Sequence, residues 1–166
     1  MRKLRRLGLA AALVAAAPAA PLTAQPAPPA PSGSLIGPAL LVSDISKSLR
    51  FYVDGLGMKV AMEMGPVDRH ETILSFGGDP RNPGIILLSD RRAGSRVAID
   101  QGHGYDRTVI RLADLHSVSA RLAAAGFAPS PIRDVAMGYR MMLATDPDGY
   151  RFELVESPAR PAEKHP

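Results

Sequence analysis

The strongest constraint on the fold is a pattern that occurs twice, about seventy residues apart. In each copy an apolar run ends at an Asp (Asp44, Asp114), a helical stripe of apolar residues follows, and a Gly (Gly57, Gly126) comes next. Asp caps helix starts and Gly favours helix ends. The first copy is one residue longer from Asp to Gly. Two copies of so long a unit predict a duplicated half-domain, and the alternative is two unrelated amphipathic helices that each follow a strand.

Each half predicts the same order of elements: a strand, a helix and three strands. The first half covers residues 35–90, with its helix over 45–56 and later strands at 58–64, 70–76 and 85–88. The second half covers residues 104–157, with its helix over 115–125 and later strands at 132–135, 139–145 and 150–156.

The N-terminus predicts a signal peptide over residues 1–24, because a basic start precedes a short apolar run over 7–20. A twin-arginine signal at Arg5-Arg6 and a disordered cytosolic tail are the alternatives. Residues 25–34 form a Pro-rich linker, and residues 158–166 are expected to be a disordered tail. The mature protein is therefore expected to be periplasmic or secreted, without a membrane partner after cleavage.

Charge and cysteine content exclude several classes of function. The formal net charge is +4, but residues 1–24 contain four of the 20 Lys and Arg residues and no Asp or Glu, so the mature chain has 16 of each sign. No basic cluster with interleaved aromatic residues remains, which argues against nucleic-acid binding. The chain has no Cys, so thiolate catalysis and Cys-ligated metals are excluded.

Two motifs, in this order and within the repeat, resemble the vicinal oxygen chelate superfamily of glyoxalase, bleomycin-resistance and dioxygenase proteins. The first is Val-Ser-Asp before a helix that contains Phe51-Tyr52 and Leu56-Gly57, and the second is Thr-Asp-Pro-Asp-Gly-Tyr at 145–150, followed by Phe-Glu-Leu-Val at 152–155. The resemblance implies an α+β fold in which two βαβββ modules form a curved mixed sheet around a cleft. It also implies a possible homodimer.

In metal-dependent members of the superfamily, four side chains from the first and last strands of the modules hold a divalent ion. The corresponding positions here are Gly37, Arg107, Ile86 or Leu87, and Glu153. Only Glu153 is a plausible ligand, because Gly and aliphatic side chains do not bind metals and Arg is a fixed cation. The sequence therefore predicts that the usual metal site is absent.

Adjacent first and last strands would bring Arg107 to Glu153, so that an ion pair replaces the metal. The alternative is that both are ordinary surface residues. Because side chains alternate between the two faces of a strand, further residues of these strands are expected to line the same cleft as Arg107 and Glu153. The predicted ligand-binding set is Arg107, Arg111, Gly37, Ala39, Leu41, Val109 and Val155, with Glu153 as the candidate catalytic group.

Two functions compete. The first is an exported protein that binds a small organic molecule in the inter-module cleft without a cofactor. The second is a metal-dependent lyase or isomerase of the lactoylglutathione lyase type, using Ni, Zn or Mn, with Glu153 and His103 as ligands and His70 as another possible member of the site. A ring-cleaving dioxygenase would need two His and a carboxylate around iron, and the sequence offers no such triad.

Overall fold

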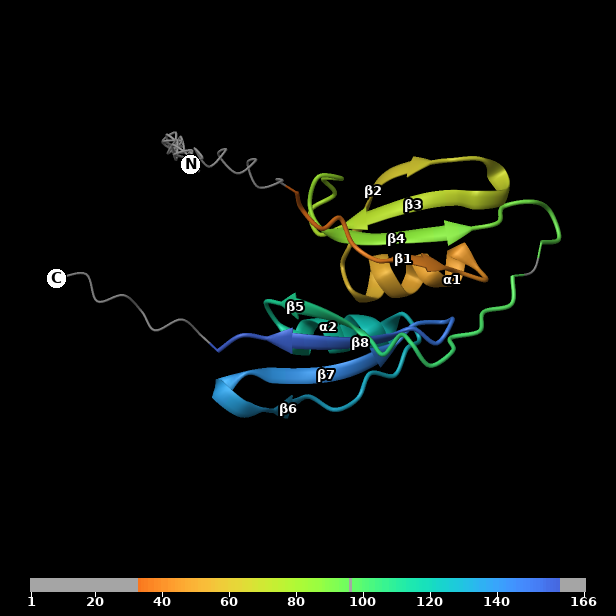
Figure 1. Ribbon diagram of the computed structural model, residues 1–166. Helices are drawn as coiled ribbons and strands as arrows, with labels where there is room; N and C mark the ends of the chain where they lie inside the picture. The colour runs from red at the N-terminus through yellow and green to blue at the C-terminus, as the bar shows by residue number, and fades with distance from the viewer. Residues whose placement is uncertain (1–32, 96, 159–166) are drawn as a thin grey trace, which may run out of the picture. The chain divides into compact units, whose positions relative to one another are not determined.

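The computed structural model describes residues 33–95 and 97–158. Module one forms a four-stranded sheet of order β1-β4-β3-β2, in which β1 is parallel to β4 and the other pairs are antiparallel (Figure 1). Its elements are β1 (Ala39–Leu41), α1 (Ile45–Leu49), the π-helix η1 (Arg50–Gly55), β2 (Lys59–Met64), the 3₁₀ turn η2 (Val67–Arg69), β3 (His70–Ser75) and β4 (Gly84–Ser89).

Module two repeats this plan as a second four-stranded sheet of order β5-β8-β7-β6, again with one parallel pair, β5 with β8. Its elements are β5 (Thr108–Leu112), α2 (Leu115–Ala124), β6 (Arg133–Asp134), the 3₁₀ turn η3 (Ala136–Gly138), β7 (Arg140–Thr145) and β8 (Arg151–Glu156). The predicted order of strand, helix and three strands in each half is confirmed.

The two Asp caps are confirmed in both halves. Asp44 accepts hydrogen bonds from the backbone N–H groups of Ser46 and Lys47, and Asp114 accepts them from His116 and Ser117. Each carboxylate thereby satisfies two N–H groups that have no partner inside the helix. The same local chemistry therefore starts both helices.

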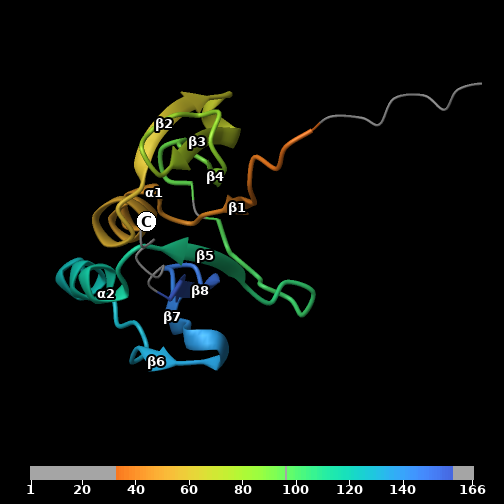
Figure 2. The same cartoon turned by 90° about the vertical axis from the view of Figure 1, so that its left-hand side faces the viewer.

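One hydrophobic core joins the two modules, formed where the helices pack on the sheets and on each other. Figure 2 shows α1 and α2 side by side on one flank, with β1 and β5 at the facing edges of the two sheets. The rings of Phe51, Tyr52 and Phe152 meet with centroids 5.0–5.7 Å apart. The Tyr52 hydroxyl donates to the Asp146 carboxylate at 2.7 Å, which ties the helix of module one to the β7–β8 turn.

Several expectations concern residues outside this region. The signal peptide over 1–24, most of the linker and the tail from residue 159 lie outside the described residues. Within residues 33–95 and 97–158, no helix has both the length and the hydrophobicity that crossing a bilayer requires.

Candidate functional site

Exposed and half-buried side chains alternate from Arg107 along strand β5. Arg107, Val109 and Arg111 are exposed, while Thr108 and Ile110 between them are half-buried. Val109 is 56% exposed, which is high for an aliphatic side chain in a strand. The predicted alternation over residues 107–111 is confirmed, and this segment borders two cavities.

The Arg107–Glu153 ion pair is confirmed. Arg107 Nε donates to Glu153 Oε2 at 2.6 Å. Val109 in β5 lies opposite Glu153 in the parallel strand β8, and Arg107, two residues before Val109, has its side chain on the same face. A second contact joins the Arg107 guanidinium to the Asp106 carboxylate. The carboxylates of Glu153 and Asp106 raise the pKa of Arg107 above its ordinary value, so the guanidinium stays charged.

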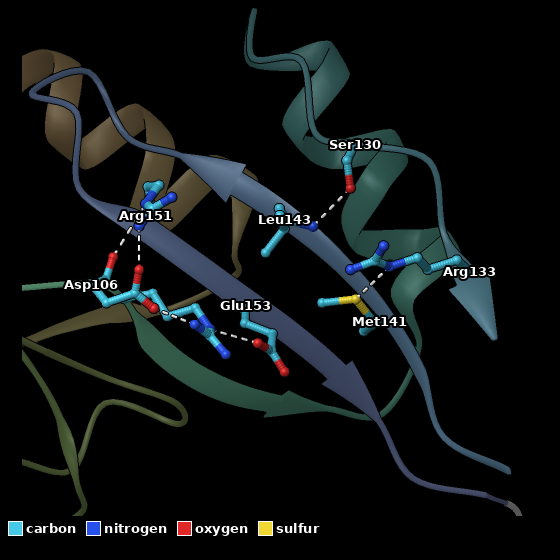
Figure 3. A network of polar contacts seen from close by, with 8 residues as sticks. Asp106, Ser130, Arg133, Met141, Leu143, Arg151 and Glu153 are labelled. Atoms are coloured by element: carbon cyan, nitrogen blue, oxygen red, sulfur yellow. Dashed lines mark hydrogen bonds and ion pairs between the residues drawn. The ribbon is translucent and has the colours of Figure 1, made fainter. Parts of the chain in front are cut away.

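The Arg107–Glu153 pair lies in a cavity of about 220 Å³ formed by module two alone, which we call the module-two cavity. Figure 3 shows the polar contacts around it, with Arg151 held by Asp106 and Arg133 contacting Met141. Its lining residues are Asp106, Arg107, Arg133, Met141, Leu143, Arg151 and Glu153. The cavity thus combines three guanidinium groups, two carboxylates and two apolar side chains.

A second cavity, of about 280 Å³, lies between the modules, and we call it the inter-module cavity. Module one contributes Leu35, Gly37, Pro38, Met58, Phe76, Pro83, Gly84 and Ile85, and β5 contributes Thr108, Val109, Ile110 and Arg111. Arg111 is the only charged lining residue, and its guanidinium forms no ion pair or hydrogen bond within residues 33–95 and 97–158. An apolar cavity with one guanidinium at its wall suits an apolar molecule that carries an acceptor or an anionic group.

The predicted ligand-binding residues therefore do not form a single site. Gly37, Val109 and Arg111 line the inter-module cavity, whereas Arg107 lines the module-two cavity. Leu41 lines a third cavity of about 290 Å³ with Asp68, Arg69, Leu88 and Ser89. Ala39 and Val155 line none of these three cavities.

Sequence reasoning missed Arg133 and Met141 as members of the module-two cavity. Period-two alternation over the strand at 139–145 places Met141 and Leu143 on one face, so that signal was present. Arg133 belongs to the two-residue edge strand β6. Such a short strand gives no periodicity from which a face can be read.

The close packing of the backbone explains why position 37 is a glycine. Its φ is +146°, and a Cβ built there would collide with the carbonyl oxygen of Gly84 in β4. A side chain at position 37 would therefore meet the backbone of module one before it reached the cavity. The missing side chain does not itself enlarge the cavity, although the Gly37 backbone lines it.

The residues at the superfamily's ligand positions do not fit a metal ion. Gly37 has no side chain that could bind a metal, and Leu87 is fully buried in the core. The guanidinium of Arg107, a fixed positive charge, is paired with the Glu153 carboxylate. His103 is exposed in the turn before β5. No group of three or more His, Asp or Glu side chains forms a possible metal site in the described part of the chain.

His70 occupies a different place from either cavity. It begins β3 opposite Ser89 in β4, and its Nε2 lies 3.8 Å from Glu63 Oε1. Both His70 Nε2 and Ser89 Oγ are buried without a hydrogen-bond partner among the described residues. His70 therefore joins neither Glu153 nor Arg107 in a common site.

The model of the Glyoxalase/Bleomycin resistance protein/Dioxygenase superfamily matches residues 35–154, which is most of the chain. The chain belongs to this superfamily. Among curated superfamily members, a probable lactoylglutathione lyase from Vibrio parahaemolyticus is 23% identical over 76% of the chain and 92% of its own length. One from Synechocystis is 24% identical over 76% of the chain and 97% of its length.

Solved structures support the superfamily fold. Glyoxalase I from Zea mays has a TM-score of 0.66 at 23% identity and matches 76% of this chain. The match covers 46% of the maize chain, so this protein spans about half its length. A glyoxalase/bleomycin resistance protein/dioxygenase domain from Frankia has a TM-score of 0.61 at 21% identity, covering 82% of this chain and 98% of that one.

Proposed function

We propose that this superfamily member binds a small organic molecule in the inter-module cavity, with the Arg111 guanidinium as its polar anchor. The observation that carries the proposal is the position of Arg111, a charged group without a protein partner in the described residues, at an otherwise apolar cavity. Hydrogen bonds to charged groups contribute about 1.5–3 kcal/mol, so one such contact can orient an apolar ligand.

The proposed binding does not use the superfamily's four-ligand metal site. Arg107 occupies a ligand position and is itself paired with Glu153, the one carboxylate among these positions. A divalent cation at Glu153 would have to displace this guanidinium or lie next to it, and like charges repel. No catalytic step through a metal is therefore proposed.

The test is a thermal-shift screen of the purified protein with small aromatic compounds, antibiotics and thioesters. Compounds that raise the melting temperature are then measured against Arg111→Gln and against Arg50→Gln, a matched control at an exposed arginine of module one that lines none of the three cavities. We expect Arg111→Gln to weaken binding about tenfold or more and the control to leave it unchanged. Hits that bind both variants like the wild type would contradict the proposal.

A metal-dependent lyase is the second candidate, favoured by the curated relatives called probable lactoylglutathione lyase. In that case Glu153 would be a ligand or proton carrier, and His103 would join it. Metal analysis separates the two candidates, because stoichiometric Ni, Zn or Mn that is lost in Glu153→Ala would overturn the metal-independent proposal. Melting temperatures that do not change across divalent ions and chelators would count against the lyase.

We also propose that the protein is exported to the periplasm or secreted, on the basis of the basic and apolar order of residues 1–24. Cell fractionation with sequencing of the mature N-terminus tests this. A protein that stays in the cytoplasm with an intact Met1 would contradict it.

A homodimer is proposed because exposed apolar side chains gather on the module-one sheet and on β5, including Leu41, Met62, Met64 and Val109. Light scattering of the purified protein decides this point, and a monomeric mass over a wide range of concentrations would reject it.

A further inference from the structure

The module-two cavity carries one positive charge more than its own carboxylates neutralise. Arg107, Arg133 and Arg151 face Asp106 and Glu153, so three guanidinium groups share two carboxylates (Figure 3). Arg107 contacts both carboxylates. The Arg151 guanidinium donates to the Asp106 carboxylate and to the Asp106 backbone carbonyl. The charges of Arg107 and Arg151 are thereby neutralised by the two carboxylates of the cavity wall.

Arg133 supplies the remaining charge. The only hydrogen bond of its side chain in the described residues runs from Nε to the Met141 sulfur, a weak and uncharged acceptor. This contact holds one edge of the guanidinium against the wall and leaves the two terminal nitrogens available. A guanidinium presented in this way matches the two oxygens of a carboxylate.

The rest of the cavity wall is apolar. Met141 is 5% exposed and forms a buried floor, whereas Leu143, two residues along β7, is 39% exposed. Leu143 is also fixed by its backbone, because its N–H donates to Ser130 Oγ at 2.8 Å and its carbonyl accepts from the Ser130 N–H at 2.8 Å. An apolar group next to the bound carboxylate would pack on these two side chains.

We infer that the module-two cavity is a binding site for a small monocarboxylate with an apolar body, anchored by Arg133. One negative charge balances the surplus guanidinium, and a second would lack a partner. The volume of about 220 Å³ suits a compact molecule. This site is separate from the inter-module cavity of the proposed function, and either can fail without the other.

The experiment uses benzoate as the probe, with benzamide as its uncharged isostere, and measures affinity by calorimetric titration of the whole protein. We expect benzoate to bind and benzamide to bind at least about tenfold more weakly. Arg133→Gln should weaken benzoate binding about tenfold or more, and Arg133→Lys should retain part of it because it keeps the charge but loses the planar fork. Equal affinity for the two probes, or no benzoate binding to the wild type, would overturn the inference.

Three further variants locate the bound probe. Asp106→Asn removes one of the two carboxylates, so benzoate binding should become tighter, and weaker binding would contradict the surplus-charge argument. Arg50→Gln, at an exposed arginine that lines none of the three cavities, should leave benzoate affinity unchanged. If Arg111→Gln abolishes binding and Arg133→Gln does not, benzoate occupies the inter-module cavity, and the inference fails while the proposed function gains support.

Discussion

The two modules start their helices in the same way and end them differently. In module two, α2 is α-helical from Leu115 to Ala124 and closes at Gly126. In module one, α1 continues as the π-helix η1, where the Leu56 N–H donates to the Phe51 carbonyl five residues earlier. The extra residue of the first copy is thus absorbed as a wider helical turn. Tyr52 and Leu122, each eight residues after its Asp cap, are both fully buried.

The wider turn also changes how the helices meet. Gly55 lies in η1 so close to α2 that an added Cβ would come within 2.6 Å of Leu122 Cδ2. Arg121 of α2 reaches the end of η1, donating to the Asp54 carbonyl at 2.9 Å and to the Val53 carbonyl at 2.9 Å. The helix of module one ends at its own Gly57, whose φ is +81°, and Arg121 of module two adds a charged donor to the carbonyl groups at that end.

The strand ends differ as well. In module two, Glu156 at the end of β8 accepts from the Leu115 N–H at 2.9 Å and pairs with Arg140. The corresponding pair in module one is Ser89 and His70, which face each other across β4 and β3. The Ser89 side chain is shorter than that of Glu156 and carries no charge. Module one therefore has no equivalent of the Glu156–Arg140 ion pair.

The largest expected effect tests the helix contact. Leu122→Ala should lower the free energy of unfolding by about 2–5 kcal/mol, because it leaves a cavity against Gly55 in the shared core. Urea denaturation measures it, with Ala123→Ser at an exposed position of α2 as the control. A loss below about 1 kcal/mol would show that the close approach of the helices adds little.

Tyr52→Phe tests the link from the helix of module one to the β7–β8 turn. The change removes the donor to the buried Asp146 carboxylate and should cost about 1–3 kcal/mol. Burial already raises the pKa of Asp146, so loss of the Tyr52 hydroxyl bond should raise it further. Tyr150→Phe, whose hydroxyl bonds a Leu41 carbonyl near the surface, is the comparison and should cost less in the same denaturation experiment.

Arg121→Ala should cost about 1–2 kcal/mol, because the carbonyl groups at the end of η1 lose a charged donor. Hydrogen exchange of residues 53–58 should accelerate more than that of α2. Uniform acceleration across both helices would mean that Arg121 does not act as a cap for module one in particular.

The smallest effect concerns Glu156. Arg140 and the Leu115 N–H hold the pKa of Glu156 below its ordinary value of 4.5, so its stabilisation is present above that pH and is lost as the pH falls through the lowered pKa. Glu156→Gln should cost under about 1 kcal/mol at pH 7, and the difference from the wild type should shrink as the pH falls through the lowered pKa of Glu156. A difference that does not depend on pH would leave the ionic link between β7 and β8 without a measurable role.

The Arg107–Glu153 contact was predictable because the resemblance to the superfamily implies that the first and last strands of a module are neighbours, and the period of two then assigns the faces of their side chains. The π-turn was visible only as one surplus residue between Asp44 and Gly57, and the sequence did not say how that residue is accommodated. Arg133 was out of reach, because a two-residue edge strand has no pattern and its contact with Met141 depends on register.

The sequence by itself determined the duplicated strand and helix order and the two Asp caps, since these follow from residue type and local spacing. The resemblance to the superfamily added which positions hold a metal in its metal-dependent members, and residue type then showed that only Glu153 among them is a plausible ligand. Only the tertiary structure decided that Gly37 and Arg107 line different cavities. That separation depends on how the two sheets are placed around a shared core, which is a product of long-range packing between side chains distant in the chain.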